Sequence, residues 1–152
     1  MTAPVFVDTN VLVSARDRAQ ATKHARAREW MARLWEARTG RLSHQVLTEY
    51  YVTVTAKLKP GMPPAAARAD VRALLAWHPT GVSPALLERA WTLQDAHHLS
   101  WWDALIVASA LATDCRTLLT EDLQDGQRFG DLEVVSPFRP EPEAALDRSG
   151  LP

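Results

Sequence analysis

The chain has 152 residues, which is enough for one compact domain and too few for two ordinary ones. Apolar residues make up 47% and charged residues 23%, so the composition excludes a disordered chain. The single cysteine, Cys115, excludes an intramolecular disulfide framework and a thiolate zinc cluster. No apolar segment approaches the length of a membrane span, and we expect a cytoplasmic protein.

The net charge is −1, but the charged residues are unevenly distributed along the chain. Residues 1–72 carry 12 Lys and Arg against 6 Asp and Glu, whereas residues 73–152 carry 5 against 12. Such polarity is compatible with a basic surface for a polyanion beside a cluster of acids. It is equally compatible with charges that the fold disperses.

The first part of the chain predicts strands and helices in alternation. Residues 4–7 form an apolar run that ends at Asp8, which predicts a buried strand followed by a helix-capping loop. Residues 20–38 predict an amphipathic helix with a basic exposed side. We expect a short strand over residues 41–43 and a helix over residues 44–58, despite the β-branched residues of this segment.

Three helices are expected in the middle of the chain. Pro63 and Pro64 open a helix over residues 65–77, consistent with proline in a first turn. Ser83 is the N-cap candidate for a helix that begins at Pro84, and Ser100 has the same role for a helix over residues 101–113.

Two further buried strands are expected, over residues 116–119 and 132–135. Short apolar strands separated by helices predict an α/β fold, with a parallel sheet and helices on both of its faces. Proline is frequent after residue 136, and the periodicity is lost there. We therefore expect one domain over residues 1–138 and a Pro-rich, flexible tail over residues 139–152.

Two of the expected strands end in acidic residues. The first strand leads into Asp8, and the strand over residues 116–119 leads into Thr120, Glu121 and Asp122. Ligands of open parallel sheets bind at the carboxyl ends of the strands, so these acids are candidates for one site. Either Asp could instead only cap a helix. Two carboxylates across one cleft repel each other unless a cation is bound.

Two more acids lie in apolar or aromatic helical segments, Glu49 in VLTEYYV and Asp103 in WWDALIV. Asp103 could merely complement its helix dipole, and Glu49 could be a surface residue. Together with Asp8 and Asp122 they would form an all-oxygen site of high negative charge. Such a site suits Mg²⁺ or Mn²⁺ better than zinc.

Four motifs follow one another between about residues 4 and 138: VFVDTNVL, LTEYYVTVTAKL, LSWWDALIVASAL and LLTEDLQDG. In this order they resemble the PIN domain, and specifically its VapC-type toxin branch. The resemblance implies a PIN-like nuclease domain, a three-layer α/β/α fold with a short central parallel sheet. The pair Trp101-Trp102 departs from the family, which commonly has a smaller or single aromatic residue there.

The resemblance also implies four catalytic, metal-binding acids: Asp8, Glu49, Asp103 and Asp122. Asn10 and Thr120 match the polar positions that support these acids, and Asp125 is a further supporting candidate. The identity of the fourth acid stays open, because Glu121 and Asp125 flank Asp122 and either could substitute for it.

The implied activity is that of an Mg²⁺- or Mn²⁺-dependent endoribonuclease, the toxin of a VapBC-type toxin–antitoxin pair. The implied partners are RNA, a cognate antitoxin and a second copy of the chain. Trp30 and Trp35 are expected at a contact with another chain, and an apolar antitoxin segment against helices 20–38 and 44–58. The candidates for holding RNA phosphates are Arg26, Arg28, Arg33 and Arg38.

Three other functions remain possible on the sequence. An aspartyl-phosphate phosphatase would need a second Asp where Asn10 stands. A catalytically silent PIN-like binding module would show damage in the acid set, which is intact. A non-toxin PIN nuclease of RNA processing would lack a neighbouring antitoxin gene.

Overall fold

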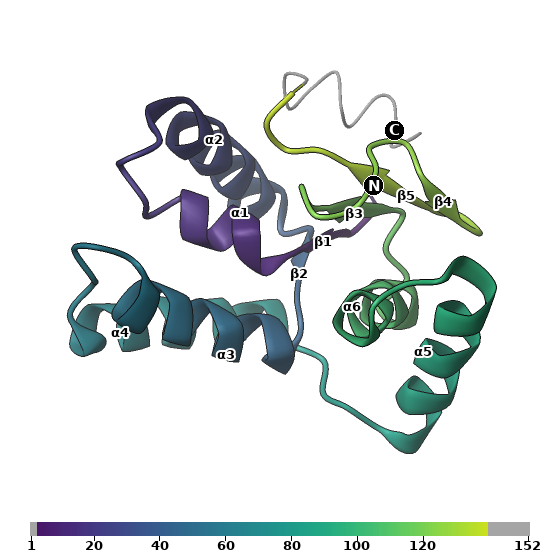
Figure 1. Ribbon diagram of the computed structural model, residues 1–152. Helices are drawn as coiled ribbons and strands as arrows, with labels where there is room; N and C mark the ends of the chain where they lie inside the picture. Colours follow the sequence, from purple (N-terminus) through teal and green to yellow (C-terminus); the bar gives the residue numbers. More distant parts are fainter. Residues whose placement is uncertain (1–2, 140–152) are drawn as a thin grey trace.

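The computed structural model describes residues 3–139 and contains a five-stranded sheet with helices on both faces (Figure 1). The strands are β1 (Val5–Val7), β2 (Gly40–Arg41), β3 (Thr117–Leu119), β4 (Arg128–Phe129) and β5 (Leu132–Val135). Their order in the sheet is β2-β1-β3-β5-β4, and all neighbours pair in parallel except β4 and β5. The expected three-layer α/β/α architecture is confirmed.

Helices and helical turns account for most of the remaining chain. They are α1 (Thr9–Ser14), α2 (Ala21–Ala37), α3 (His44–Val52), η1 (Thr53–Lys57), α4 (Pro64–Leu74), η2 (Leu75–Trp77), α5 (Pro84–His97) and α6 (Trp101–Ala112). Ser83 and Ser100 are the N-caps of α5 and α6, as the sequence predicts, because their side chains accept from the backbone N–H three residues ahead. Within residues 3–139, no helix is both long and apolar enough to cross a bilayer.

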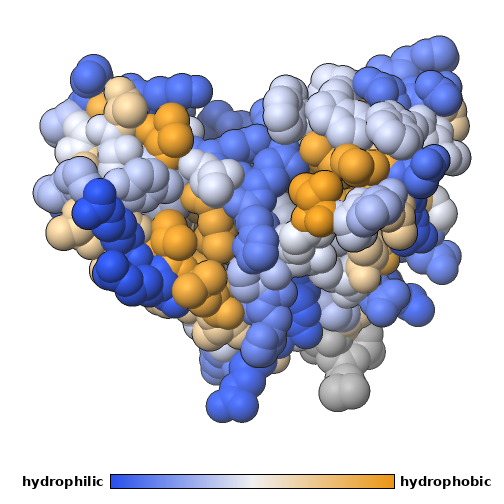
Figure 2. Space-filling view, turned by 90° about the horizontal axis from the view of Figure 1, so that it is seen from below, coloured by the Kyte–Doolittle hydropathy of each residue, from blue (hydrophilic) through white to orange (hydrophobic). Residues whose placement is uncertain are grey.

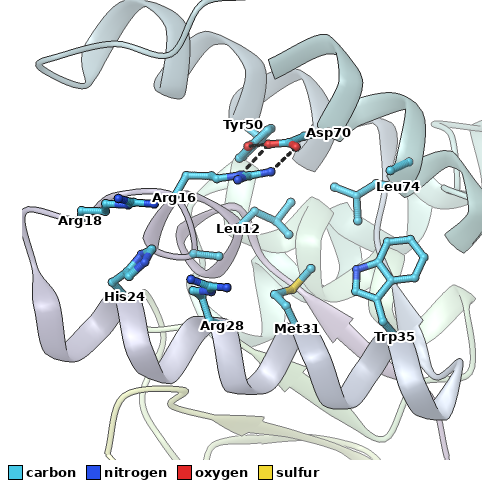
Figure 3. Close-up of a pocket in the computed structure, with 12 residues that line it drawn as sticks. Leu12, Arg16, Arg18, His24, Arg28, Met31, Trp35, Tyr50, Asp70 and Leu74 are labelled. Atoms are coloured by element: carbon cyan, nitrogen blue, oxygen red, sulfur yellow. Dashed lines mark hydrogen bonds and ion pairs between the residues drawn. The ribbon is translucent and has the colours of Figure 1, made fainter. Parts of the chain in front are cut away.

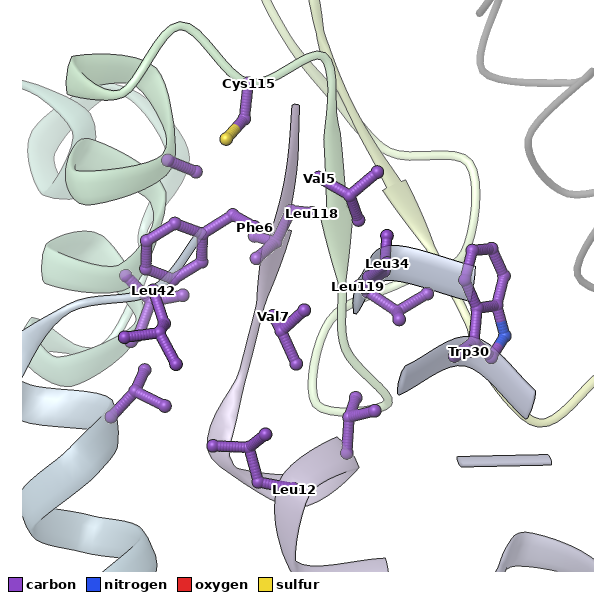
Figure 4. Packing of buried hydrophobic residues seen from close by; sticks show 14 of the residues in the cluster. Val5, Phe6, Val7, Leu12, Trp30, Leu34, Leu42, Cys115, Leu118 and Leu119 are labelled. Atoms are coloured by element: carbon purple, nitrogen blue, oxygen red, sulfur yellow. The ribbon is translucent and has the colours of Figure 1, made fainter. Parts of the chain in front are cut away.

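The core lies on both faces of the sheet, as Figure 4 shows. Alternate residues of a strand point to opposite faces, so Val5 and Val7 of β1 face α2 while Phe6 faces the layer of α6 and α3 (Figure 4). All three side chains are fully buried. This packing fixes the position of the loop that follows β1, where the first candidate acid lies.

Several predicted boundaries are wrong in detail. The helix expected over residues 44–58 is α-helical only to Val52 and continues as the π-helical turn η1. The helix expected over 65–77 begins at Pro64 and ends in a 3₁₀ turn. The strand expected over residues 41–43 is β2, which begins one residue earlier and ends at Arg41. Tertiary packing sets these boundaries, which periodicity does not resolve.

The prediction for Trp30 is wrong. Trp30 is fully buried, and its indole N–H donates to the carbonyl of Pro137 at 3.1 Å, so it is a core residue and not a contact for another chain. Trp35, in contrast, is 40% exposed. The predicted tail over residues 139–152 lies, apart from Arg139, outside the described residues.

Candidate active site

The carboxyl ends of β1 and β3 bring the first two acids to one edge of the sheet. The strands are adjacent and parallel, with Val7 beside Leu119, so the residues that follow them also meet. The hydroxyl of Thr120 donates to Asp8 Oδ2 at 2.8 Å. The backbone N–H of Thr9 donates to Asp8 Oδ1 at 2.7 Å, which makes Asp8 the N-cap of α1. Both carboxylate oxygens of Asp8 therefore accept a hydrogen bond.

Asn10 connects the two strand ends through its side-chain amide. Its Nδ2 lies 3.0 Å from Thr120 Oγ1, 3.2 Å from Asp122 Oδ2 and 3.5 Å from Asp8 Oδ2. Its Oδ1 accepts from the backbone N–H of Glu121 at 3.4 Å. The amide is a neutral donor between two carboxylates, and it orients them without cancelling their charge.

The other two acids come from helices. Glu49 of α3 accepts from the Thr9 hydroxyl at 2.9 Å and from Gln45 Nε2 at 3.0 Å. Asp103 lies in the first turn of α6, which Ser100 caps. Desolvation by burial raises the pKa of Asp103, and the charges of Asp122 and Glu49 raise it further.

Asp8 has the most perturbed carboxyl group of the site. Burial raises its pKa from 3.8 to about 6, and the neighbouring charges of Asp122 and Glu49 add to this, against the hydrogen bonds from Thr120 and Thr9. The charges of Asp122 and Glu49 thus act on both Asp8 and Asp103. Within residues 3–139, no Lys, Arg or His forms an ion pair with any of them. In the part of the chain that the structure describes, these carboxylates have no cationic partner.

The acids Glu49 and Asp122 line a groove of about 670 Å³, together with Thr9, Asn10, Lys23, Thr53 and Lys57. Figure 2 shows that this side of the molecule is hollowed between the lobe of α3 and α4 and the lobe of α5 and α6, with hydrophilic residues in the middle of the recess. The groove gives an extended ligand access to the carboxylates.

The donor set fits a hard divalent cation. Its potential ligand atoms are carboxylate and hydroxyl oxygens, and within residues 3–139 no ion pair compensates the charge of the carboxylates. Among residues 3–139, no three Asp, Glu, His or Cys side chains are close enough to hold one metal ion directly. Mg²⁺ usually takes only one or two carboxylates directly and keeps several waters. The spacing is therefore compatible with binding that is partly water-mediated.

The three acids that follow β3 have different partners. Glu121 forms an ion pair with Lys23 (2.7 Å), and Asp125 Oδ1 accepts from the backbone N–H of Ser136 at 2.9 Å. The carboxylate of Asp122 accepts from Asn10 Nδ2 at 3.2 Å, and the backbone N–H of Asp122 donates to Thr120 Oγ1 at 3.1 Å. The geometry favours Asp122 as the fourth acid of the site.

The four arginines of α2 do not form one face. Arg26 and Arg33 are seven residues apart and share a side of the helix, whereas Arg28 lies on the opposite side and lines a different pocket. Arg38 is the C-cap in a left-handed conformation, with φ of 59°. A role for these residues in RNA binding stays a prediction.

Sequence reasoning missed Thr9 and Gln45, which hold Glu49, and the two lysines of the groove, Lys23 and Lys57. Gln45 precedes Glu49 by four residues, and Lys57 follows it by eight. Helical spacing could have found Gln45 as a neighbour of Glu49, but the position of Lys57 depends on the π turn η1.

Residues 5–128 match the PIN domain family, and the chain belongs to this family. Several solved structures are similar, including the following two. One is the *Mycobacterium tuberculosis* toxin VapC20, which cleaves the sarcin-ricin loop (24% identity, TM-score 0.58, covering 75% of this chain and 86% of that one). The other is a toxin–antitoxin complex from *Klebsiella pneumoniae* (22% identity, TM-score 0.64, covering 90% and 98%). At these identities the likeness shows the fold. Among curated proteins, none matches this sequence.

Proposed function

We propose that this protein is an Mg²⁺- or Mn²⁺-dependent endoribonuclease and the toxin of a toxin–antitoxin pair, acting in the cytoplasm. The observation that carries the proposal is a group of four acids, Asp8, Glu49, Asp103 and Asp122. The charges of Asp122 and Glu49 act on both Asp8 and Asp103, and none of the four forms an ion pair with a Lys, Arg or His within residues 3–139. Membership of the PIN family supports a nuclease, and the similarity to the toxin VapC20 and to a chain of a toxin–antitoxin complex supports the toxin role.

In this proposal the protein's own residues hold and orient the acids. Thr120 and Thr9 fix the two oxygens of Asp8, and Asn10 sets Asp8 against Asp122. The four acids would hold the metal. When bound, a divalent ion polarises a phosphate oxygen and lowers the pKa of a bound water. The arrangement is preorganised, because its hydrogen bonds already exist before RNA arrives.

The direct test is incubation of the purified protein with total RNA in Mg²⁺, Mn²⁺ or chelator, followed by mapping of the cut ends. We expect internal cuts that require a divalent ion and that are absent with Asp8→Asn. Cleavage that persists in chelator, or in the Asp8→Asn protein, would show that another site or a contaminant acts.

A second pocket supports the antitoxin partner. It has a volume of about 530 Å³ and lies between α1, α2, α3 and α4, the region where we expected an apolar antitoxin segment (Figure 3). Leu12, Met31 and Trp35 give it apolar walls, and Arg18 and Arg28 also line it (Figure 3). We propose that the antitoxin packs here and extends a basic or polar side chain to the acids.

The proposed homodimer needs a surface other than Trp30. Trp91 of α5 and Trp102 of α6 are 47% and 61% exposed, and they offer apolar area on the other lobe.

Light scattering and the cleavage assay, with the protein alone and with the product of its genomic neighbour, test both partners. We expect a dimer that the neighbour inhibits. A monomer at tens of micromolar that the neighbour leaves fully active would contradict both expectations.

A further inference from the structure

The groove of Glu49 and Asp122 extends along α3 to the π-helical turn η1. Thr53 and Lys57, the first and last residues of that turn, line the same groove as the two acids. The backbone N–H of Leu58 donates to the carbonyl of Thr53 at 3.0 Å, the five-residue hydrogen bond that defines a π turn. Such turns are rare and occur frequently at functional sites.

The π turn affects which residues face the groove. Glu49, Thr53 and Lys57 are spaced by four residues. In an uninterrupted α-helix, eight residues rotate a side chain by about 80° beyond two full turns. A π turn has more residues per turn and opposes this rotation. Lys57 therefore stays on the side of Glu49, about 12 Å further along the axis by the α-helical rise.

The two lysines of the groove differ in their partners. Lys23 Nζ is 2.7 Å from Glu121 Oε2, so its charge is already matched. Lys57 is exposed and, within residues 3–139, has no ion pair and no side-chain hydrogen bond. Among the described residues that line the groove, Lys57 is thus the cation whose charge is available to an anionic ligand.

We propose that η1 is a phosphate-binding subsite, at which Lys57 pairs with a backbone phosphate of single-stranded RNA beyond the phosphate at the carboxylates. This inference rests on the proposed function. A lysine suits a flexible strand, because its ammonium is a mobile point charge that needs no fixed fork geometry. Lys57 also places a positive charge in a groove that contains acidic residues, and this charge can neutralise a phosphate of a polyanion. A purely structural role, complementing the carbonyl end of the helix, is the alternative that the test must separate.

The test compares Lys57→Gln with Lys57→Arg, which keeps the charge, and with Lys59→Gln. Lys59 is an exposed lysine two residues away that does not line the groove. Binding of a labelled single-stranded oligoribonucleotide is followed by fluorescence anisotropy in chelator, between about 50 and 200 mM salt. Each protein's melting temperature and its cleavage of RNA in Mn²⁺ are measured in parallel.

Loss of one phosphate contact predicts a salt dependence that is less steep by about 0.7 and an affinity about fivefold lower at about 0.1 M salt. We expect this for Lys57→Gln only. Unchanged affinity and slope in Lys57→Gln, a lower melting temperature alone, or an equal loss in Lys59→Gln would overturn the subsite. A wild-type protein that cleaves no RNA in Mn²⁺ would instead overturn the proposed function.

Discussion

Two aspartates of this protein, Asp8 of the candidate active site and Asp70 in the second pocket, have opposite surroundings. Asp8 is 5% exposed, has other carboxylates nearby and, among residues 3–139, has no cationic partner. Asp70 of α4 accepts from Arg16 Nε at 2.8 Å and from the hydroxyl of Tyr50, and it forms an ion pair with Arg16 (Figure 3). The same side chain is thus left uncompensated at one site and fully matched at the other.

The difference separates a binding arrangement from a structural one. The Asp70 carboxylate raises the pKa of Arg16, mainly through their hydrogen bond. Burial, followed by that hydrogen-bonded carboxylate, raises the pKa of Tyr50 well above its usual value. Asp70 and Arg16 therefore stabilise each other's charged forms. The Asp8 site, in contrast, favours the binding of a proton or of a cation from solution.

The largest expected effect is on RNA cleavage. Asp8→Asn removes a charge with almost no change in volume, and we expect cleavage to fall at least about 100-fold, as for loss of a metal-binding group. Asp70→Asn should retain most of the activity, since Asp70 lies in the other pocket. Circular dichroism and melting curves verify that both proteins are folded. Full cleavage by a folded Asp8→Asn protein would remove Asp8 from the mechanism.

The next effect is on the pH dependence of stability without metal. The folded state binds the Asp8 proton more tightly than the unfolded chain, with a pKa of about 6 against 3.8. Protonation of Asp8 therefore stabilises the folded state. This stabilisation is complete below about pH 4 and is lost as the pH rises through about 6. The loss is up to about 3 kcal/mol, at about 1.4 kcal/mol per pH unit. Urea unfolding at several pH values measures it.

Asp8→Asn is the matched control for that pH dependence. It should flatten the fall in stability between about pH 4 and 6, whereas Asp70→Asn should keep it. An identical pH profile in wild type and Asp8→Asn would mean that Asp8 does not titrate in this range.

Metal ions should stabilise the protein by a comparable amount. A ligand at about 100 times its Kd stabilises the folded state by about 2.7 kcal/mol. We expect millimolar Mn²⁺ to raise the melting temperature of wild type, and less so at about pH 5, where protons compete for Asp8. Asp8→Asn and Asp103→Asn should melt higher without metal and respond less to it. A wild-type melting curve that Mn²⁺ leaves unchanged would count against the site.

The smallest expected effect is from Asp70. Asp70→Asn leaves Arg16 without its counter-charge, and we expect a loss of about 1–2 kcal/mol, because Arg16 is half-exposed and the pair is partly screened. The Mn²⁺ response should remain. Tyr50→Phe removes one donor to Asp70 and should cost about 1 kcal/mol. Loss of the metal response in Asp70→Asn would show that the two regions are coupled.

The sequence predicts those parts of the fold that local patterns determine. The apolar runs of β1, β3 and β5 and the serine caps of α5 and α6 are in the expected places, because burial and capping are local properties. The helix α1 was missed because it has only six residues, too few for a periodic pattern. The strand β4 has two residues and is defined only by pairing with β5.

Side-chain partners depend on tertiary contacts and could be predicted only in part. The motif order pointed to Asp8, Glu49, Asp103 and Asp122, but no local pattern tells that Asn10 and Thr120 bridge two strand ends. The π turn follows ordinary helical sequence, so its effect on Lys57 is visible only in the folded chain. Trp30 was misplaced because a large aromatic residue serves a core and an interface equally well.

Calorimetric titration of the metal-free protein with Mn²⁺ tests the central claim most directly, because it needs neither the right RNA nor a partner. The account predicts that wild type and Asp70→Asn bind Mn²⁺ alike, while Asp8→Asn and Asp103→Asn bind it at least about tenfold more weakly. Equal binding by all four proteins, or none by wild type, would contradict the assignment of these carboxylates as a metal site.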